Sequence, residues 1–505
     1  MSNSQITKNT LPIEEDTKNL KQKTIKGIMW NFVELFGKYG LTLLISLTLA
    51  RILGPKDYGL IGLATAFFAI ANAIIDGGFK TVLIRKKTVT SADYNTIFYF
   101  NLFASAVVYA AVFFLAPLIA KFYGEPRLVP LTRFIGITFF FNALCLIQQT
   151  DRSRKLNFKI QAFITLPAGL VSGAVAIYLA LNGFGVWSLA VQMVLGSFLV
   201  TGLYWALNGW RPSLVFSWGS FREMFSGGVM FFLYSILQSI YTNGVTLIVG
   251  KVVPVQQLGY YTLGNKIITL SSQNIRNAVQ TVTFPAFSKV QDDRKKLTQG
   301  YRMVIQSVTA IVFPLMAALF ILSEPLIQLF LGEKWIPAVP YLKILCVSGA
   351  ISSLSSINAN VLTVKASPEL NLKLKVVRIT LMLSVIALLA NFGMIVMLWG
   401  MVFNYACAYI LNSYFNLPYM DYSILRQIRD VLPAVASSVF MAMILYCIQM
   451  IIPVDALHLQ LILSVPVAGI SYVVFCYLFK VAAMKQFLQS IGKRYFPVSV
   501  RTLYP

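Results

Sequence analysis

The amino-acid sequence predicts an all-α integral membrane protein with about fourteen transmembrane helices. The chain of 505 residues is 57% hydrophobic and only 12% charged, with a mean hydropathy of +0.71. So few charged residues cannot cover the water-facing surface of a soluble protein of this length. Apolar stretches of about 20 residues, enough to cross a bilayer, recur along the whole chain, as at 95–119 and 431–452.

Short polar or basic loops separate the predicted spans. The spans lie near 28–53, 58–76, 95–119, 130–149, 161–181, 186–207, 226–250, 258–283, 300–322, 340–364, 374–391, 395–415, 431–452 and 459–479. We therefore expect a tail at 1–27, a first lobe at 28–207, a linker at 208–225, a second lobe at 226–415, an added helix pair at 416–479 and a tail at 480–505.

Basic residues predict how the spans are oriented. The tails and every second loop carry clusters such as Arg85–Lys87 and Arg294–Lys296, whereas the opposite loops hold few basic residues, for example Lys56 and Lys334. Because Lys and Arg hold loops on the cytoplasmic side, both termini are predicted to be cytoplasmic. This clustering also argues against nucleic acid as the partner, which the net charge of +24 alone would suggest.

Two segments offset by 200 residues resemble each other. Arg51 stands eight residues before Gly59, and Lys251 stands eight residues before Gly259. Apolar hairpins can align by chance, but two lobes of six spans plus an added pair also give fourteen. We therefore expect two pseudo-symmetric lobes with a substrate path between them, as in transporters built from repeats.

Ionisable and polar residues inside spans are costly and therefore mark candidate sites. The eighth predicted span is so polar that it must line a water-filled path or a buried interface. The candidates for lining a central cationic cavity are Lys38, Lys266, Arg276, Gln238, Asn243, Gln273 and Asn358, and the candidates for gating or ion pairing are Glu34, Asp76 and Arg51. Amides suit sugars and cations suit phosphates, so the pattern favours an anionic, sugar-bearing substrate.

Simpler roles are also open for some of these residues. Glu34 and Lys38 are four residues apart, which also suits a local ion pair on one helix face. Arg51 lies at the outer end of its span, where its side chain could extend to the lipid headgroups.

Several segments resemble bacterial exporters of the polysaccharide transport family, within the multidrug/oligosaccharidyl-lipid/polysaccharide flippase superfamily. The resemblance is carried by Lys26–Asn31, Leu49–Gly59, Asp76–Phe79, Ile84–Lys87 and Gly185–Leu189. It implies the fold shared with multidrug transporters of that superfamily, in a multi-pass protein of the bacterial inner membrane. It also implies a flippase that moves undecaprenyl-diphosphate-linked oligosaccharide to the outer leaflet by alternating access.

The resemblance further implies partners and roles for residues. The partners would be the lipid-linked glycan, the bilayer, and the polysaccharide polymerase and glycosyltransferases. In relatives a cationic central cavity holds the diphosphate–sugar headgroup, which makes Lys38, Lys266 and Arg276 candidates for that role here.

Two other functions are weighed against this one. A cation-coupled multidrug antiporter of the same superfamily would need deep acidic residues, and Glu34 and Asp76 are the only candidates. A membrane-embedded polysaccharide polymerase or ligase would need a large outer loop, whereas the outer loops here are short.

No catalytic, metal or cofactor site is expected from the sequence. The five cysteines show no CxxC or Cys/His spacing, and the one histidine, His458, lies in a short outer loop without a catalytic set. The chain also lacks a nucleotide-binding motif, so direct use of ATP is not expected.

Asp76 and Arg276 are equivalent under the 200-residue offset, and we predict that they form an ion pair that breaks during transport. Reversing the charge at either position alone should then impair transport of the substrate. If each single reversal leaves transport unchanged, the pair is not a gate.

Overall fold

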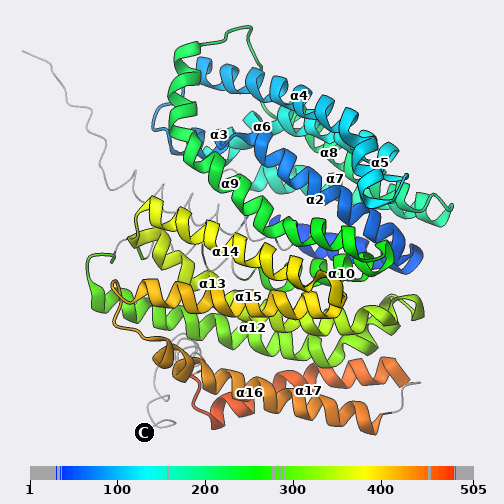
Figure 1. The fold of residues 1–505 in the computed structure, drawn as a ribbon, viewed down its shortest axis with the longest axis vertical. Helices are drawn as coiled ribbons and strands as arrows, with labels where there is room; N and C mark the ends of the chain where they lie inside the picture. Colours follow the sequence, from blue (N-terminus) through cyan, green and yellow to red (C-terminus); the bar gives the residue numbers. More distant parts are fainter. Residues whose placement is uncertain are drawn as a thin grey trace, which may run out of the picture. The chain divides into compact units, whose positions relative to one another are not determined.

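The computed structural model is helical in all of its described regular structure (Figure 1). The described part consists of residues 30, 34–35, 37–155, 158–273, 275, 280, 283, 287–288, 290–452, 456–482 and 484. These residues form two compact units. One unit combines the residues up to Leu49 with Phe68–Ile236, and the other combines Ala50–Phe67 with the residues from Leu237 onward.

Two helices contribute to both units. Helix α2 (Pro55–Asp76) begins in the second unit and ends in the first, and α9 (Trp218–Val252) does the reverse. The first unit also contains most of a helical segment at 37–52. Its remaining helices are α3 (Phe79–Arg85), α4 (Ser91–Tyr123), α5 (Leu128–Gly136), α6 (Thr138–Arg154), α7 (Phe158–Leu181) and α8 (Val186–Leu207).

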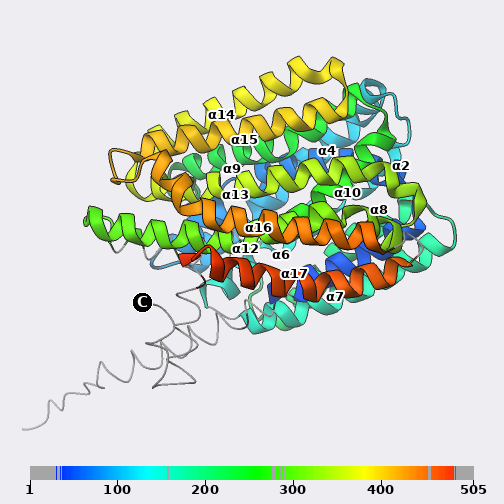
Figure 2. The ribbon, with the colours of Figure 1, turned by 90° about the horizontal axis from the view of Figure 1, so that it is seen from below.

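The second unit holds the rest of the chain. Its elements are α10 (Val255–Ile268), the π-helical turn η1 (Thr269–Gln273), α12 (Arg294–Phe330), η2 (Glu333–Ala338), α13 (Val339–Lys365), α14 (Pro368–Leu389), η3 (Ala390–Phe392), α15 (Met394–Asn416), α16 (Ile424–Ile451) and α17 (Leu457–Leu478). Helices α16 and α17 lie side by side (Figure 2). The Tyr472 hydroxyl of α17 donates to the carbonyl of Ala310 in α12 at 2.7 Å.

Local sequence explains where several helices begin and end. Thr90 and Asp93 form a capping box in which each side chain accepts a hydrogen bond from the other residue's backbone N–H. Gly124 ends the same helix, α4, with φ of 69°, a conformation that costs glycine little. Ser423 caps α16 by accepting from the backbone N–H of Arg426.

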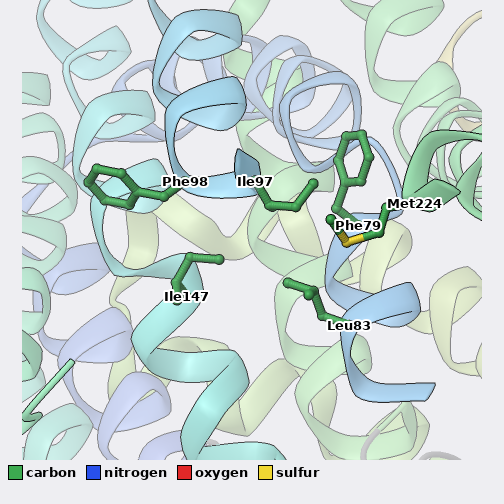
Figure 3. Packing of buried hydrophobic residues seen from close by; sticks show 6 residues of the cluster. All are labelled: Phe79, Leu83, Ile97, Phe98, Ile147 and Met224. Carbon is green, nitrogen blue, oxygen red and sulfur yellow. The ribbon is translucent and has the colours of Figure 1, made fainter. Parts of the chain in front are cut away.

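A hydrophobic core holds one end of the first unit together (Figure 3). It joins four helices through side chains that are at most 3% exposed: Phe79 and Leu83 of α3, Ile97 and Phe98 of α4, Ile147 of α6 and Met224 of α9. The core fixes α6 relative to α3, which directly follows the turn at the end of α2.

Helices α2 and α10 cross so closely that only glycine fits at the contact. A Cβ atom on Gly59 would lie 2.0 Å from the Val255 carbonyl oxygen, and one on Gly259 would lie 1.8 Å from the Pro55 oxygen. These are the two glycines that match at the 200-residue offset. They therefore occupy reciprocal places, each beside the backbone at the start of the other helix.

Trp335 of η2 completes this crossing. Its indole is fully buried, donates to the Ala50 carbonyl at 2.7 Å, and meets the Tyr58 ring edge-on at 5.4 Å. Arg51 has a structural partner here, because its guanidinium donates to the Leu329 carbonyl at 2.8 Å, near the end of α12. This contact lets Arg51 cap the C-terminal end of α12, and its role in gating stays a prediction.

The all-α fold is confirmed, and a helix covers all or part of each predicted span. Within the described residues, eleven helices are long and apolar enough to cross a membrane. The other three predicted spans are the first, whose start lies outside the described residues, and those at α10 and α14. Helix α10 has only 14 residues before η1, and α14 carries three basic residues at 373–378. The number fourteen therefore stays a prediction.

Replacing Gly259 by alanine should lower the free energy of unfolding by about 1–3 kcal/mol, because the new methyl group would collide with backbone. The thermal unfolding midpoint in detergent would show this. Gly469→Ala in α17 is the matched control, since nothing lies within 4 Å of a Cβ there, and alanine favours a helix. Equal midpoints for the two variants would contradict the close crossing.

Candidate functional site

A row of polar side chains runs along α2 and α6 in the first unit. We call it the α2–α6 strip and define it as Asn72, Asp76 and Asn142. The Asn142 amide nitrogen donates to the Asn72 side-chain oxygen at 3.2 Å. The Asn72 amide in turn donates to the Phe68 carbonyl at 2.9 Å. The sequence did not single out these two asparagines, because each stands alone in a largely apolar span and only folding brings them together.

Asp76 stands at the end of α2, before a glycine turn. Its carboxylate accepts a hydrogen bond from the backbone N–H of Lys80 and interacts electrostatically with the Lys80 ammonium group. Its Oδ1 atom is buried and has no hydrogen-bond partner in the described part of the chain. Gly77 and Gly78 make the turn possible with φ of 56° and 75°, in the left-handed region that favours glycine.

The C-terminal end of α3, which follows this turn, is held by charged side chains. Arg154 of α6 donates to the backbone carbonyl of Leu83 and, at 2.7 Å, to that of Lys86. The Lys86 ammonium group lies 3.1 Å from Asp93 and 3.0 Å from Glu223. Burial alone would lower the pKa of Lys86, but these two carboxylates outweigh it and the pKa is raised.

Glu34 and Lys38 belong to the first helical segment. Glu34 is half-buried and Lys38 is exposed. They interact electrostatically, but the described structure contains no salt bridge between them. Their predicted roles in gating and substrate binding are not decided by this placement, so both remain predictions.

Lys266 lies in the last turn of α10 in the second unit, three residues before the π-helical turn η1 begins. Its side chain is half-buried, and its ammonium group makes no hydrogen bond or ion pair with the described residues. A π-helical turn within a longer helix is often found at functional positions. Arg276 and the side chain of Gln273 lie outside the described residues, so their assignment to the cavity stays a prediction.

Lys375 is a buried cation next to the start of the predicted span at 374–391. It is 5% exposed and donates to the Gln238 side-chain oxygen. The Gln238 amide nitrogen donates to Thr242 at 3.1 Å. A local signal was available, because Ser367 and Pro368 mark a helix start before the predicted span at 374–391. That start places Lys375 two turns inside α14.

Asn243, also predicted to line the cavity, is half-buried in α9. Its amide donates to the Ser239 carbonyl one turn earlier at 3.0 Å. The neighbouring Tyr241 hydroxyl donates to the Asn404 oxygen of α15 at 3.5 Å. Asn243 therefore binds its own helix, while Tyr241 reaches a second one.

Asn358, the last predicted cavity residue, is fully buried at 0% exposure. It lies at the centre of a polar network inside the second unit that joins α12, α13, α15 and α16. Its amide nitrogen donates to Ser413 at 2.8 Å and its side-chain oxygen accepts from Tyr301. Gln427 of α16 accepts from Tyr409 at 3.0 Å and also from Asn358 at 3.3 Å. These partners satisfy Asn358 within the protein and give it a structural role.

The arrangement offers polar and cationic groups that can bind a polar, anionic ligand. The α2–α6 strip presents amides and a carboxylate, while Lys38 and Lys266 supply cations on other helices. Within the described residues no group of three or more His, Cys, Asp and Glu side chains could hold a metal ion.

Comparison with protein families identifies the chain. A family model described as a polysaccharide biosynthesis protein matches residues 48–340, more than half of the sequence. The chain belongs to this family. Among its relatives is the lipopolysaccharide biosynthesis protein WzxC of Escherichia coli K12, 27% identical over 383 residues that cover 73% of this chain and 76% of WzxC. The succinoglycan biosynthesis transport protein ExoT of Rhizobium meliloti 1021 is 25% identical over 66% of this chain and 68% of ExoT.

Solved structures share the fold of this family member. The lipid II flippase MurJ, in an inward closed conformation, matches with a TM-score of 0.73, covering 90% of this chain and 98% of MurJ at 14% identity. An inward-facing multidrug transporter of the MATE family in the MOP superfamily matches with a TM-score of 0.60, covering 78% of this chain and 97% of that one at 15% identity. At these identities the likeness concerns the fold alone.

Replacing Asn358 by alanine should lower the free energy of unfolding by about 1–3 kcal/mol, since buried partners such as Tyr301 would lose a hydrogen bond. Thermal unfolding in detergent would measure the loss. Asn360→Ala, on the same helix, is the control, because the Asn360 amide nitrogen is buried without a hydrogen-bond partner in the described chain. A network of no structural importance would give both variants the same midpoint.

Proposed function

We propose that the chain is a flippase that moves undecaprenyl-diphosphate-linked oligosaccharide from the cytoplasmic to the outer leaflet of the bacterial inner membrane. Membership of the polysaccharide biosynthesis family carries this proposal. The names of WzxC and ExoT place those relatives in polysaccharide biosynthesis, and that of ExoT adds transport. The polar residues within the helices supply the chemistry that such a substrate would need.

The mechanism follows from the chemistry of the substrate. Its diphosphate is anionic, its sugars offer hydroxyl groups, and its polyprenyl chain is apolar. A cationic side chain such as that of Lys266 would bind the diphosphate, and amide side chains would bind the sugars. The polyprenyl chain would stay among lipid tails, beside the exposed apolar faces of the spans. Alternating exposure of the polar residues to the two sides of the membrane would then complete transport.

The basic loops support a cytoplasmic location for both termini, with the protein acting as a multi-pass inner-membrane transporter and not as an enzyme. A polysaccharide polymerase and glycosyltransferases would act after and before it, since they would consume and supply its substrate.

A leaflet assay tests this function. Purified protein in vesicles should make a labelled undecaprenyl-diphosphate oligosaccharide accessible to a membrane-impermeant sugar-modifying reagent. Lys266→Ala and Arg276→Ala should each slow this step about tenfold or more, because a hydrogen bond to a charged group is lost. Lys296→Ala is the control, since Lys296 is a surface residue that pairs with Asp293.

The possible results distinguish the question of whether the protein is a flippase from the question of whether Lys266 and Arg276 bind its substrate. If both variants still translocate the glycolipid at the wild-type rate, the protein is a flippase but Lys266 and Arg276 do not bind its substrate. If no glycolipid moves, but a cationic dye is expelled under a proton or Na⁺ gradient, the protein is an antiporter instead.

A further inference from the structure

The Asn72–Asn142 pair lies within the membrane-spanning part of the first unit. Asn142 is near the middle of the candidate span Leu128–Arg154, and Asn72 is one turn before the end of α2. Asn142 is exposed and Asn72 is half-buried. An exposed amide at this depth is unfavourable against lipid, because hydrocarbon offers no hydrogen-bond partner. The pair is therefore best explained by a wet surface or a polar ligand.

Asn142 retains hydrogen-bonding capacity after its bond to Asn72. An asparagine amide has two N–H donors and a carbonyl acceptor. One donor is used by Asn72, and within the described residues the structure shows no further hydrogen bond of the exposed Asn142 side chain. An adjacent donor and acceptor match a sugar, whose hydroxyl and acetamido groups both donate and accept. A phosphate group, in contrast, accepts hydrogen bonds and would use only the donor.

The charge beside the pair also favours the sugar. Asp76 follows Asn72 by four residues, so it lies on the same face of α2 about 6 Å along the helix. A carboxylate accepts hydrogen bonds from sugar hydroxyls, whereas an ionised diphosphate has no hydrogen-bond donor to offer it. The α2–α6 strip is thus suited to the uncharged portion of a lipid-linked glycan.

The pair is also held in a fixed position. Asn72 is fixed through its bond to Phe68. The backbone of α6 on both sides of Asn142 accepts hydrogen bonds from α8, from Thr201 to Phe141 at 2.9 Å and from Trp205 to Leu144 at 3.1 Å. Further along α6, Ile147 enters the core shown in Figure 3. Binding groups held in this way lose little entropy when a ligand binds.

We propose that Asn72 and Asn142 form a glycan-contacting site that recognises the sugar portion of the lipid-linked substrate. The site is separate from the cations that bind the diphosphate. This inference rests on the proposed flippase function and adds to it a specificity element, located on α2 and α6.

Binding of two lipids that differ only in the sugar tests the site. The probes are undecaprenyl diphosphate and undecaprenyl-diphosphate disaccharide, each titrated against the full-length protein in nanodiscs. Wild type should bind the disaccharide lipid more tightly. Asn142→Ala should weaken its binding on the order of three- to tenfold, the loss of one or two neutral hydrogen bonds, and change binding of the bare diphosphate less than about twofold. Asn142→Gln, with a longer side chain bearing the same amide, should recover part of the loss.

Two controls make the outcomes distinct. Asn182→Ala, an exposed loop asparagine beyond α7, should bind both lipids as wild type does. Lys266→Ala should weaken the binding of both lipids to the same extent. If Asn142→Ala weakens the binding of both lipids to the same extent, or of neither, the asparagine pair does not recognise the sugar and the inference is wrong. If wild type binds neither lipid, the proposed function itself fails.

Discussion

Hydrocarbon provides no hydrogen-bond partners, and this constraint determines most of the structure. It requires the backbone of each span to satisfy itself within a helix. It also requires each polar side chain in the membrane to find a partner in the protein or water. Trp335 meets the requirement through the Ala50 carbonyl, and Asn358 through its network of neighbours. Asn142 meets it only in part, which is why its remaining donor and acceptor suggest a ligand.

The same constraint explains which features could be predicted. Long apolar runs report directly on spanning helices, so the all-α fold and the helix at each predicted span followed from hydropathy. The places of polar side chains were harder to derive, because the sequence does not show which way each face of a helix points. The polarity of Asn358 did not reveal that it is fully buried in a hydrogen-bond network, and the sequence around Lys375 did not reveal that its side chain is buried in α14. Asn72 and Asn142 come together only through folding, since 70 residues separate them.

Glycine has a part in this architecture that hydropathy does not reveal. The reciprocal contacts of Gly59 and Gly259 bring α2 and α10 to within backbone contact, in the region that Trp335 then covers. The 200-residue repeat pointed to these positions, although only the structure shows that the two repeated segments contact each other. Because α2 belongs to both units, this crossing lies on a helix whose other end carries Asn72 and Asp76.

The exposed polar positions within the spans, such as Asn142 and Lys38, should face water and not lipid. Single cysteines, introduced into a background free of the five native ones, would test it with a charged, membrane-impermeant thiol reagent applied from the cytoplasmic side. Cysteines at Asn142 and Lys38 should react, whereas those at Leu170 and Ile470, which are 55% and 66% exposed on apolar helix faces, should not. If positions 142 and 38 prove as unreactive as the two apolar positions, the polar residues do not line a water-filled path and the account is contradicted.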